Sequence, residues 1–489
     1  MRLKELFEGI SYQGQLPQGE AELVTIDSRK VCPGAVFVCT RGGRFDGHDF
    51  AAGALENGAA AVVTDHPLGL EREVVVPDTR RAYALLCHNY FGNPAKKLKL
   101  VAVTGTNGKT TVTYLLKQIL EYAGFRCGLI GTIRSEVDQM EIPAKFTTPE
   151  AWDLAALFAR MVSAGCSHVL LEASSQALDQ LRLYGLQFEV GLFTNLTRDH
   201  LDYHGTMENY YQAKRSLFDQ TNAAVINLDD AWGRRLAAEI PPQRVMTCSV
   251  ERDEADLTGK NLELRADGVQ FEMVGKDFIQ RIRFPMPGGY SAHNALVAAG
   301  GALLLGIDPA TVARALTHSP GVRGRCEVLY SGKFTIICDY AHTGDGIEKV
   351  LSGLRPFVKG RLLALFGCAG QRDRAKRAPM AQAAMRYADL IVLTSDNPRA
   401  EDPYEILADV EPELKKGKIP YFVEVERRRA IRLALSLLQD QDVLVLCGKG
   451  HEDYQVIDGV TIYLDEHRIV ADWLRQQGLA GSGQEKEQE

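Results

Sequence analysis

Short apolar runs alternate with stretches of helical periodicity along most of the chain. One series of these runs lies at residues 99–105, 168–174, 190–196 and 223–229. A second series begins after Glu327 and lies at residues 334–340, 361–367, 388–396 and 442–448. Continuous apolar strands between helices are typical of parallel sheets that are covered on both faces. The pattern therefore predicts two successive α/β domains, the second of them doubly wound.

The N-terminal part has a different pattern, with short strand-like runs at residues 21–26, 34–40, 59–64 and 72–77 and little long helix. It predicts a small α/β domain that ends at the polar, proline-containing link 93–97. A chain of 489 residues exceeds one core, since cores stop growing near ~250–300 residues. We expect domains at 1–97, 98–327 and 328–480, followed by a polar, disordered tail at 481–489.

Composition narrows the class of protein. The chain is 45% hydrophobic and 24% charged, as in ordinary globular proteins, and its formal net charge is -7. A net negative charge without a Lys/Arg cluster argues against a nucleic-acid-binding protein. The N-terminus has no apolar signal-peptide core, and no apolar run reaches the ~18–20 residues of a membrane span. We expect a cytoplasmic, monomeric enzyme that acts on charged small molecules.

The ten cysteines are scattered, and no two have C-x-x-C spacing. Cys338, Cys368 and Cys447 lie within apolar, strand-like runs. This placement predicts buried, reduced thiols rather than disulfides or a metal site.

The segment Thr104–Thr111, TGTNGKTT, predicts a phosphate-binding loop between a strand and a helix that runs from Lys109 to Tyr122. Glycines let the backbone approach an anion, and a helix N-terminus offers free N–H groups. Lys109 would contact the terminal phosphates and Thr110 a Mg²⁺ ion. Val103 occupies the first glycine position of the usual motif. A plain glycine turn would also fit these residues, and the lack of an NKxD motif disfavours a GTPase.

Further motifs follow in an ordered series. They are Asp27-Ser28-Arg29, Asp46-Gly47, Thr147–Glu150, Glu172–Ser175, Thr194–Asp202, Ala213-Lys214, Gly324–Glu327, Asp339–His342, Asp396–Arg399 and Gly448–Glu452. Together with the phosphate loop, this series resembles the Mur ligases, which add amino acids to the UDP-muramoyl peptide of the bacterial cell-wall precursor. It most resembles their MurE branch, and within it the enzymes that add meso-diaminopimelate.

The resemblance implies an ATP-dependent ligase with a small UDP-binding domain, a central phosphate-loop ATPase domain and a C-terminal Rossmann-like domain. ATP would phosphorylate the D-glutamate γ-carboxyl, and an amine would attack the acyl phosphate. The implied catalytic residues are Lys109, Glu172, His200 and Lys214. Thr110, Glu172 and His200 would bind Mg²⁺, and so would Lys214 as a carbamate (N6-carboxylysine). By their local sequence alone, Glu172 could be a helix-initial acid, His200 a packed histidine and Lys214 a solvated lysine.

Two binding sites are implied in the same way. The ATP contacts would be Gly105, Thr106, Asn107, Gly108, Lys109, Thr110, Thr111, Asn294, Arg325 and Asp339. The UDP-muramoyl-peptide contacts would be Ile26, Ser28, Gly43, Arg44, Phe45, Thr147, Thr148, Ser174, Gln180 and Arg182. Arg182 has the clearest physical reason, because a guanidinium suits carboxylates and phosphates.

The incoming amino acid would be bound in the C-terminal domain. The implied contacts are Arg372, Asp396, Asn397, Pro398, Arg399, Gly448 and Glu452. Arg399 can hold the second carboxylate that distinguishes diaminopimelate from lysine, and Glu452 suits the distal ammonium. Leaving a buried partner of such a pair without its counter-ion costs ~3–5 kcal/mol. Without the family context, residues 396–399 could be a plain Asx-Pro turn.

Several positions differ from the usual pattern of the branch. They are Gln176, Gly344-Asp345-Gly346, Ala369-Gly370-Gln371 and Gly289-Tyr290-Ser291-Ala292. These departures leave open a divergent paralogue that adds L-lysine or another amino acid. The sequence also leaves open a folylpolyglutamate-synthase-like ligase and a non-catalytic nucleotide-binding scaffold. The motif at Asp396–Arg399 argues against the folate-type ligase, and the joint presence of Lys109, Glu172, His200 and Lys214 argues against the scaffold.

Overall fold

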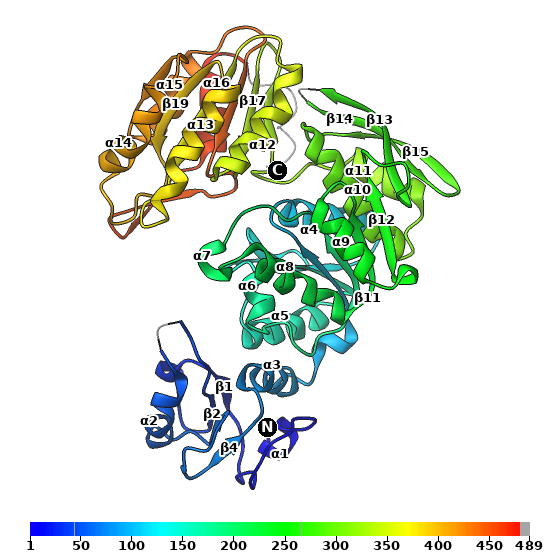
Figure 1. The fold of residues 1–489 in the computed structure, drawn as a ribbon, viewed down its shortest axis with the longest axis vertical. Coiled ribbons are helices and arrows are strands. Elements are labelled where there is room, and N and C mark those ends of the chain that lie inside the picture. The colour runs from blue at the N-terminus through cyan, green and yellow to red at the C-terminus, as the bar shows by residue number, and fades with distance from the viewer. Residues whose placement is uncertain (44, 266, 480–489) are drawn as a thin grey trace. The chain divides into compact units, whose positions relative to one another are not determined.

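The structure is a computed structural model that describes residues 1–43, 45–265 and 267–479 (Figure 1). The chain divides into two compact units. Unit 1 comprises Met1–Leu257 and Val297–Val312, and unit 2 comprises Thr258–Leu296 and Ala313–Glu489. The predicted tail and Arg44 lie outside the described residues. The domain boundaries at 97 and 327 stay predictions.

The N-terminal part of unit 1 contains a parallel sheet in the order β1-β2-β3-β4. Its strands are β1 (Leu23–Thr25), β2 (Ala35–Val38), β3 (Ala61–Thr64) and β4 (Glu73–Val75). Its helices are α1 (Leu3–Leu6), α2 (Ala51–Glu56) and α3 (Thr79–Tyr90). The expectation of little long helix was wrong for α3, which has 12 residues and begins at the capping carboxylate of Asp78.

A larger sheet of unit 1 contains the strand order β12-β11-β10-β5-β9-β6-β7-β8. The bounds are β5 (Lys99–Thr104), β6 (Cys127–Ile130), β7 (Arg134–Val137), β8 (Met140–Pro143), β9 (His168–Glu172), β10 (Phe188–Phe193), β11 (Thr221–Asn227) and β12 (Val245–Ser249). Strands β12 to β6 pair in parallel, whereas β7 and β8 add an antiparallel edge.

Helices connect these strands. They are α4 (Lys109–Tyr122), α5 (Ala151–Ser163), α6 (Ser175–Asp179), α7 (Leu201–His204), α8 (Met207–Arg215) and α9 (Ala231–Glu239). Two further helices, α10 (Gly289–Leu304) and α11 (Pro309–Thr317), contain residues at which the chain passes from one unit to the other. The carboxyl ends of the parallel strands β5, β9 and β10 lead directly into the predicted motifs.

Unit 2 contains a sheet in the order β16-β17-β21-β18-β19-β20, parallel except for the β16–β17 pair. Its strands are β16 (Glu327–Ser331), β17 (Thr335–Asp339), β18 (Leu362–Cys368), β19 (Leu390–Ser395), β20 (Tyr421–Val423) and β21 (Val443–Cys447). Its helices are α12 (Gly344–Leu354), α13 (Arg377–Tyr387), α14 (Pro403–Leu414), α15 (Arg427–Ser436) and α16 (Glu466–Gln476).

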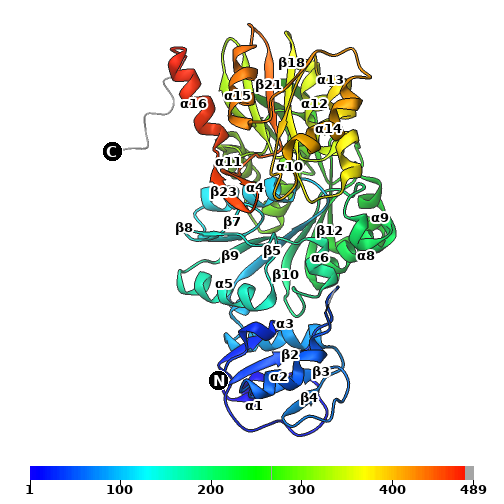
Figure 2. The same cartoon turned by 90° about the vertical axis from the view of Figure 1, so that its left-hand side faces the viewer.

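Successive residues of the strands enter two separate cores of unit 2. Leu362, Ala364 and Phe366 pack with helices α12, α13 and α14. Leu363 and Leu365 pack with α15 and α16 on the other face. Figure 2 shows β18 and β21 between α15 on one side and α13 and α14 on the other. A sheet that is apolar on both faces explains the continuous apolar runs, and the predicted α/β class is confirmed.

Unit 2 also contains antiparallel strands that the sequence pattern did not single out. One group consists of β13 (Leu257–Arg265), β14 (Gly268–Gly275) and β15 (Phe278–Phe284). A second hairpin is formed by β22 (Tyr454–Ile457) and β23 (Val460–Tyr463). All ten cysteines are free, and all are buried except Cys32, which is exposed against expectation. Among the described residues, no helix combines the length and apolar character needed to cross a membrane.

Candidate active site

The phosphate loop has the predicted strand–turn–helix geometry, since β5 ends at Thr104 and α4 begins at Lys109. Gly105 and Gly108 have φ values of 147° and 87°, which favour glycine. A Cβ atom at Gly105 would lie 1.9 Å from the Thr194 hydroxyl oxygen, so no side chain fits there. The backbone can therefore approach an anion at the N-terminus of α4.

Residues that follow β10 hold this loop in place. The Asn107 N–H donates to Asn195 Oδ1 over 3.1 Å, and the Thr194 hydroxyl donates to the Asn107 carbonyl over 2.6 Å. The Thr197 N–H donates to Thr106 Oγ1 over 3.0 Å. The sequence grouped these residues into one motif, but only the structure shows that they position the loop.

Lys109 and Lys214 converge on one carbonyl oxygen of the loop. Their ammonium groups donate to the Gly105 oxygen over 2.9 and 2.8 Å. Lys214 is 1% exposed, so its interpretation as a solvated lysine was wrong. Its Nζ lies 4.6 Å from the centre of the Tyr210 ring. Burial, together with the nearby charge of Lys109, holds the pKa of Lys214 well below its ordinary value.

The carboxylate of Glu172 ends strand β9 and is fully buried. It accepts hydrogen bonds from the Thr110 hydroxyl over 2.9 Å, the Thr132 hydroxyl over 2.9 Å and the Thr132 N–H over 2.8 Å. A Cβ at Gly131 would lie 2.4 Å from Glu172 Oε1, so the carboxylate rests against a glycine. The structure thus joins two predicted metal-binding residues and adds Thr132, which the sequence gave no reason to select.

His200 precedes helix α7 and has a left-handed backbone conformation, with φ at 51°. Its side chain is 48% exposed, and its Nε2 lies 3.5 Å from Asp199 Oδ2. Its ring centre lies 6.2 Å from that of Tyr210, the ring that also contacts Lys214. A half-exposed imidazole beside the phosphate loop is not a packed core histidine.

The predicted peptide contacts of unit 1 form one hydrogen-bonded group. The Thr147 hydroxyl lies 3.1 Å from that of Thr132, and the Thr148 hydroxyl lies 3.1 Å from that of Ser174. Arg182 donates to the Thr148 carbonyl over 2.7 Å and to Gln180 Oε1. Its Nε also lies 3.0 Å from Glu150, a residue that the sequence grouped with Thr147 and Thr148. The pKa of Arg182 is lowered by burial.

The predicted UDP contacts of the N-terminal domain lie at its surface. Ile26 and Ser28 are partly buried after β1, while Gly43 is exposed and Phe45 is 72% exposed. Arg44 lies outside the described residues.

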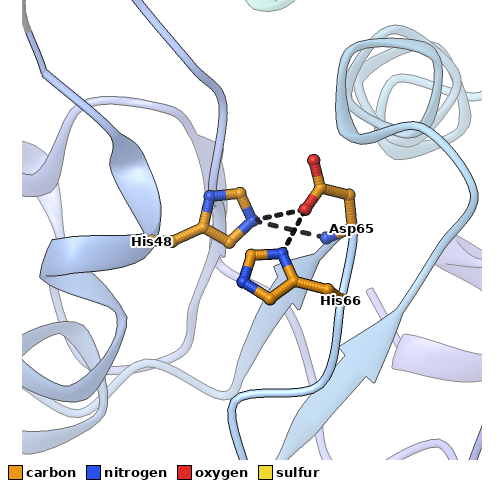
Figure 3. Close-up of side chains that lie close together, drawn as sticks. All are labelled: His48, Asp65 and His66. Atoms are coloured by element: carbon orange, nitrogen blue, oxygen red, sulfur yellow. Dashed lines mark hydrogen bonds and ion pairs between the residues drawn. The ribbon is translucent and has the colours of Figure 1, made fainter.

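Two histidines of the N-terminal part, His48 and His66, lie close together beside Asp65 (Figure 3). Asp65 Oδ1 lies 3.2 Å from His48 Nε2 and 2.5 Å from His66 Nδ1, while His48 Nδ1 lies 2.5 Å from Asp46. Hydrogen bonds within the group therefore account for these three ring nitrogens.

The remaining predicted nucleotide contacts are in unit 2. Asn294 is partly buried on α10. The guanidinium carbon of Arg325 lies 4.5 Å from the centre of the Tyr340 ring. Asp339, at the end of β17, accepts the N–H groups of Cys326 and Ala341 over 2.6 and 2.7 Å. Burial raises the pKa of Asp339.

The predicted amino-acid contacts follow β19 and β21. Asp396 and Asn397 are buried, and Arg399 has a left-handed backbone with φ at 57°. Arg399 Nη1 donates to the Gly370 carbonyl over 2.7 Å. A Cβ at Gly448 would lie 2.7 Å from Asp396 Oδ2, so the two loops touch. Pro398 is buried and Arg372 is exposed.

Glu452 joins this group through Lys449, which the sequence did not select. Lys449 is fully buried, and its ammonium donates to Asn397 Oδ1 over 2.7 Å and to Glu452 Oε2 over 3.0 Å. Lys449 and its partners Asn397 and Glu452 all stand in motifs that the sequence identified. Membership of these motifs was the signal that could have selected Lys449.

A buried ion pair fixes the strand ends below these loops. Arg427 and Glu466 are both fully buried, with Nε and Oε1 2.7 Å apart. Arg427 also donates to the Ser395 carbonyl at the end of β19 and to the Cys447 carbonyl at the end of β21. The two loops therefore start from strand ends that share one guanidinium.

The residues that depart from the usual pattern have defined places in the fold. Gln176 lies in α6, and the Gly346 N–H donates to Thr343 Oγ1 over 3.1 Å at the start of α12. Gly344 faces Pro379, 3.0 Å from an ideal Cβ position. Gln371 has a left-handed backbone and donates its N–H to Glu401. Tyr290 is partly buried and packs against a core of unit 2.

Three sequence models of one family match the chain. The Mur ligase family catalytic domain matches residues 20–87, the Mur ligase middle domain residues 103–302 and the Mur ligase glutamate ligase domain residues 324–450. The three matches account for the predicted three-domain architecture.

Relatives and solved structures extend the similarity to nearly the whole chain. The 2,6-diaminopimelate ligase of Clostridium perfringens, named for its substrate UDP-N-acetylmuramoyl-L-alanyl-D-glutamate, is 40% identical over 97% of this chain and 99% of its own. Its Clostridium botulinum counterpart is 41% identical over 94% and 96%. A solved structure of a ligase with the same name is 34% identical, with a TM-score of 0.73 over 98% of this chain and 99% of its own.

Proposed function

The chain belongs to the Mur ligase family, and from this premise we propose that it joins 2,6-diaminopimelate to UDP-N-acetylmuramoyl-L-alanyl-D-glutamate, consuming ATP. The observation that carries the proposal is the similarity, over nearly the full length, to ligases named for this reaction. The acceptor is the D-glutamate γ-carboxyl and meso-diaminopimelate the amine. The reaction contributes to peptidoglycan synthesis, and we place it in the cytoplasm with the enzyme as a monomer.

The reaction proceeds in two steps. The γ-carboxylate attacks the terminal phosphorus of ATP, which forms an acyl phosphate and releases ADP. The amine of the amino acid then attacks the acyl carbon, which forms the amide and releases phosphate. The backbone of residues 105–108 and the Lys109 ammonium are suited to hold the phosphates, because both supply N–H donors at the start of α4. Thr111, Asn294, Arg325 and Asp339 complete the proposed nucleotide contacts.

The oxygen donors beside the loop fit a hard divalent cation. Thr110 Oγ1 and Glu172 lie 2.9 Å apart, and oxygen ligands of this kind are the ones that Mg²⁺ prefers. We propose that Thr110, Glu172, His200 and carbamylated Lys214 hold Mg²⁺. Bound Mg²⁺ neutralises charge on the phosphates and the acceptor carboxylate.

The environment of Lys214 supports its carbamylation. Only a neutral amine reacts with carbon dioxide, and burial beside Lys109 lowers the pKa of Lys214. We expect Lys214→Ala to lose most activity and to recover part of it when acetate or propionate is added, since either acid can replace the carbamate. Mass spectrometry at neutral pH would show one carbon dioxide on the native protein. Full activity of the unrescued variant would refute the role.

The assay that tests the function measures ADP release and product mass. Purified protein receives ATP, Mg²⁺ and UDP-N-acetylmuramoyl dipeptide with meso-diaminopimelate, L-lysine or other amino acids, one at a time. ADP release that requires both the dipeptide and meso-diaminopimelate supports the proposal. ADP release that requires the dipeptide and occurs with L-lysine but not with meso-diaminopimelate identifies a divergent paralogue. Release with a folate and glutamate identifies a folylpolyglutamate-synthase-like ligase, and no turnover with any pair refutes the enzymatic role.

The wild-type assay needs a matched inactive protein. Lys109→Ala removes the ammonium that lies beside the loop, so we expect it to retain the fold and to lose ADP release. ADP release at the wild-type rate by a folded Lys109→Ala protein would contradict this role of Lys109.

A further inference from the structure

The loop after β21 contains a lysine with no exposed surface. The Lys449 ammonium lies 2.7 Å from Asn397 Oδ1, 3.0 Å from Glu452 Oε2 and 3.9 Å from Asp396 Oδ1. Removing an ammonium from water is costly unless it is paired and hydrogen-bonded. Lys449 therefore needs these acceptors, and in return it holds them at defined positions.

The first consequence concerns the orientation of the Asn397 amide. Its Oδ1 accepts from Lys449 and from the Val456 N–H over 2.9 Å. Its Nδ2 donates to Glu452 Oε2 over 3.1 Å. A flipped amide would place an N–H₂ group against two donors, so the network permits one orientation.

The second consequence concerns the carboxylate of Glu452. Its Oε2 accepts from both Lys449 and Asn397, whereas the partner described for Oε1 is the Tyr340 hydroxyl at 3.4 Å. One oxygen is thus anchored and the other keeps acceptor capacity for a ligand. The side chain of Glu452 is 14% exposed, so this oxygen lies in a largely desolvated setting, where a cation is bound strongly.

We propose that Lys449 is a positioning residue that presents Glu452 to the distal ammonium of the amino-acid substrate. This inference rests on the proposed function, because it assumes that a diamino acid binds beside Asp396–Arg399. Lys449 acts through Asn397 and Glu452 and does not touch the reacting amine. A purely electrostatic role of Lys449 predicts the opposite change in KM. A buried ammonium repels the incoming cation, so its removal would tighten binding.

The test compares two substrates that differ in one group. 2-Aminopimelate has both carboxylates of diaminopimelate and lacks the distal ammonium. For Lys449→Met we expect the KM for meso-diaminopimelate to rise about 10-fold or more, because charge-assisted hydrogen bonds to Glu452 are lost. The KM for ATP, the KM for the UDP-dipeptide and the turnover of 2-aminopimelate should stay within about 3-fold of the wild-type values.

A double-mutant cycle with Glu452→Gln tests whether Lys449 acts through that carboxylate. We expect Lys449→Met to change the KM for diaminopimelate by less than about 3-fold in the Glu452→Gln background. Lys333→Met, at an exposed lysine, is the matched control and should behave as wild type. Thermal unfolding of Lys449→Met and of a second variant, Lys449→Gln, distinguishes a loss of positioning from a loss of folding.

Each outcome decides the inference. An unchanged or lowered KM for diaminopimelate in Lys449→Met overturns it. A loss of catalysis with 2-aminopimelate as large as the loss with diaminopimelate overturns it too. Failure of both Lys449 variants to fold assigns the lysine to stability alone. If the wild-type protein uses lysine instead, lysine and 2-aminohexanoate form the same comparison. A wild-type protein that uses no diamino acid refutes the proposed function before any variant is measured.

Discussion

Replacing Thr132 with valine removes one hydrogen bond from the buried carboxylate of Glu172 while keeping the shape of the side chain. The lost donor is the Thr132 hydroxyl, 2.9 Å from Oε2. The Thr132 N–H and the Thr110 hydroxyl remain, at 2.8 and 2.9 Å. Each carboxylate oxygen therefore keeps one donor, and Oε2 loses one of its two.

The size of the effect follows from the charge of the acceptor. A hydrogen bond to a charged group contributes about 1.5–3 kcal/mol, which is about 10- to 150-fold in an equilibrium constant. Because two donors to Glu172 remain, we expect the lower end of that range. The Mg²⁺ concentration that gives half-maximal rate should rise about 10-fold in Thr132→Val and stay within about 3-fold in Thr132→Ser.

The assay measures initial rates against free Mg²⁺ at saturating ATP and UDP-dipeptide. Thr147→Val is the matched comparison, because it removes the other hydroxyl that Thr132 contacts and leaves Glu172 untouched. Its Mg²⁺ dependence should be that of the wild type. A wild-type Mg²⁺ curve for Thr132→Val, or an equal shift in Thr147→Val, would refute the reasoning.

Three further predictions concern other parts of the molecule. Arg399→Ala should lower kcat/KM for diaminopimelate at least 100-fold and for lysine much less, because one carboxylate loses its partner; an unchanged ratio of the two in competition assays would contradict this. Gly131→Ala should abolish activity, since its Cβ would lie 2.4 Å from Glu172 Oε1, and wild-type turnover would disprove the clash. The pair of His467 and Glu327 should stabilise unit 2 between about pH 4.5 and 6.5. Burial opposes both charges, yet their mutual hydrogen bond raises the pKa of His467 and lowers that of Glu327. The His467 contribution is complete below its unfolded pKa and is lost as pH rises through its folded pKa; the Glu327 contribution is lost at acidic pH. The loss of thermal stability in His467→Gln should be larger at pH 6 than at pH 9, and equal losses would exclude the pair as its source.

Local features of the site could be predicted from the sequence. The phosphate loop is one strand, one turn and one helix, and the helix predicted at Lys109–Tyr122 has those bounds in the structure. Glycine, threonine and lysine act there through neighbouring backbone groups. Glu172 could be placed at a strand end for the same reason, because the apolar run before it defines β9.

Features that depend on distant residues could not be predicted in this way. Lys214 stands next to Arg215, and nothing in that dipeptide says which side chain is buried. The contact that buries Lys214 is with Gly105, 109 residues earlier. Thr132 was missed for the same reason, since its partner Glu172 lies 40 residues away. Lys449 stands in a predicted motif, but its burial against Asn397, 52 residues earlier, could not be predicted from that motif. The strands β13 to β15 were missed because alternating charged residues interrupt their apolar pattern.

The buried pair of Arg427 and Glu466 has a consequence for engineering. Arg427 contacts the carbonyl oxygens of Ser395 and Cys447, and every residue type supplies such an oxygen. The segments after β19 and β21 can therefore be exchanged as cassettes without removing the bonds that fix their starting points. A library that varies residues 398–401 and 453–456 on this scaffold, and keeps the acceptors Asn397 and Glu452 of the buried Lys449, should yield more folded members than one that also varies residue 427.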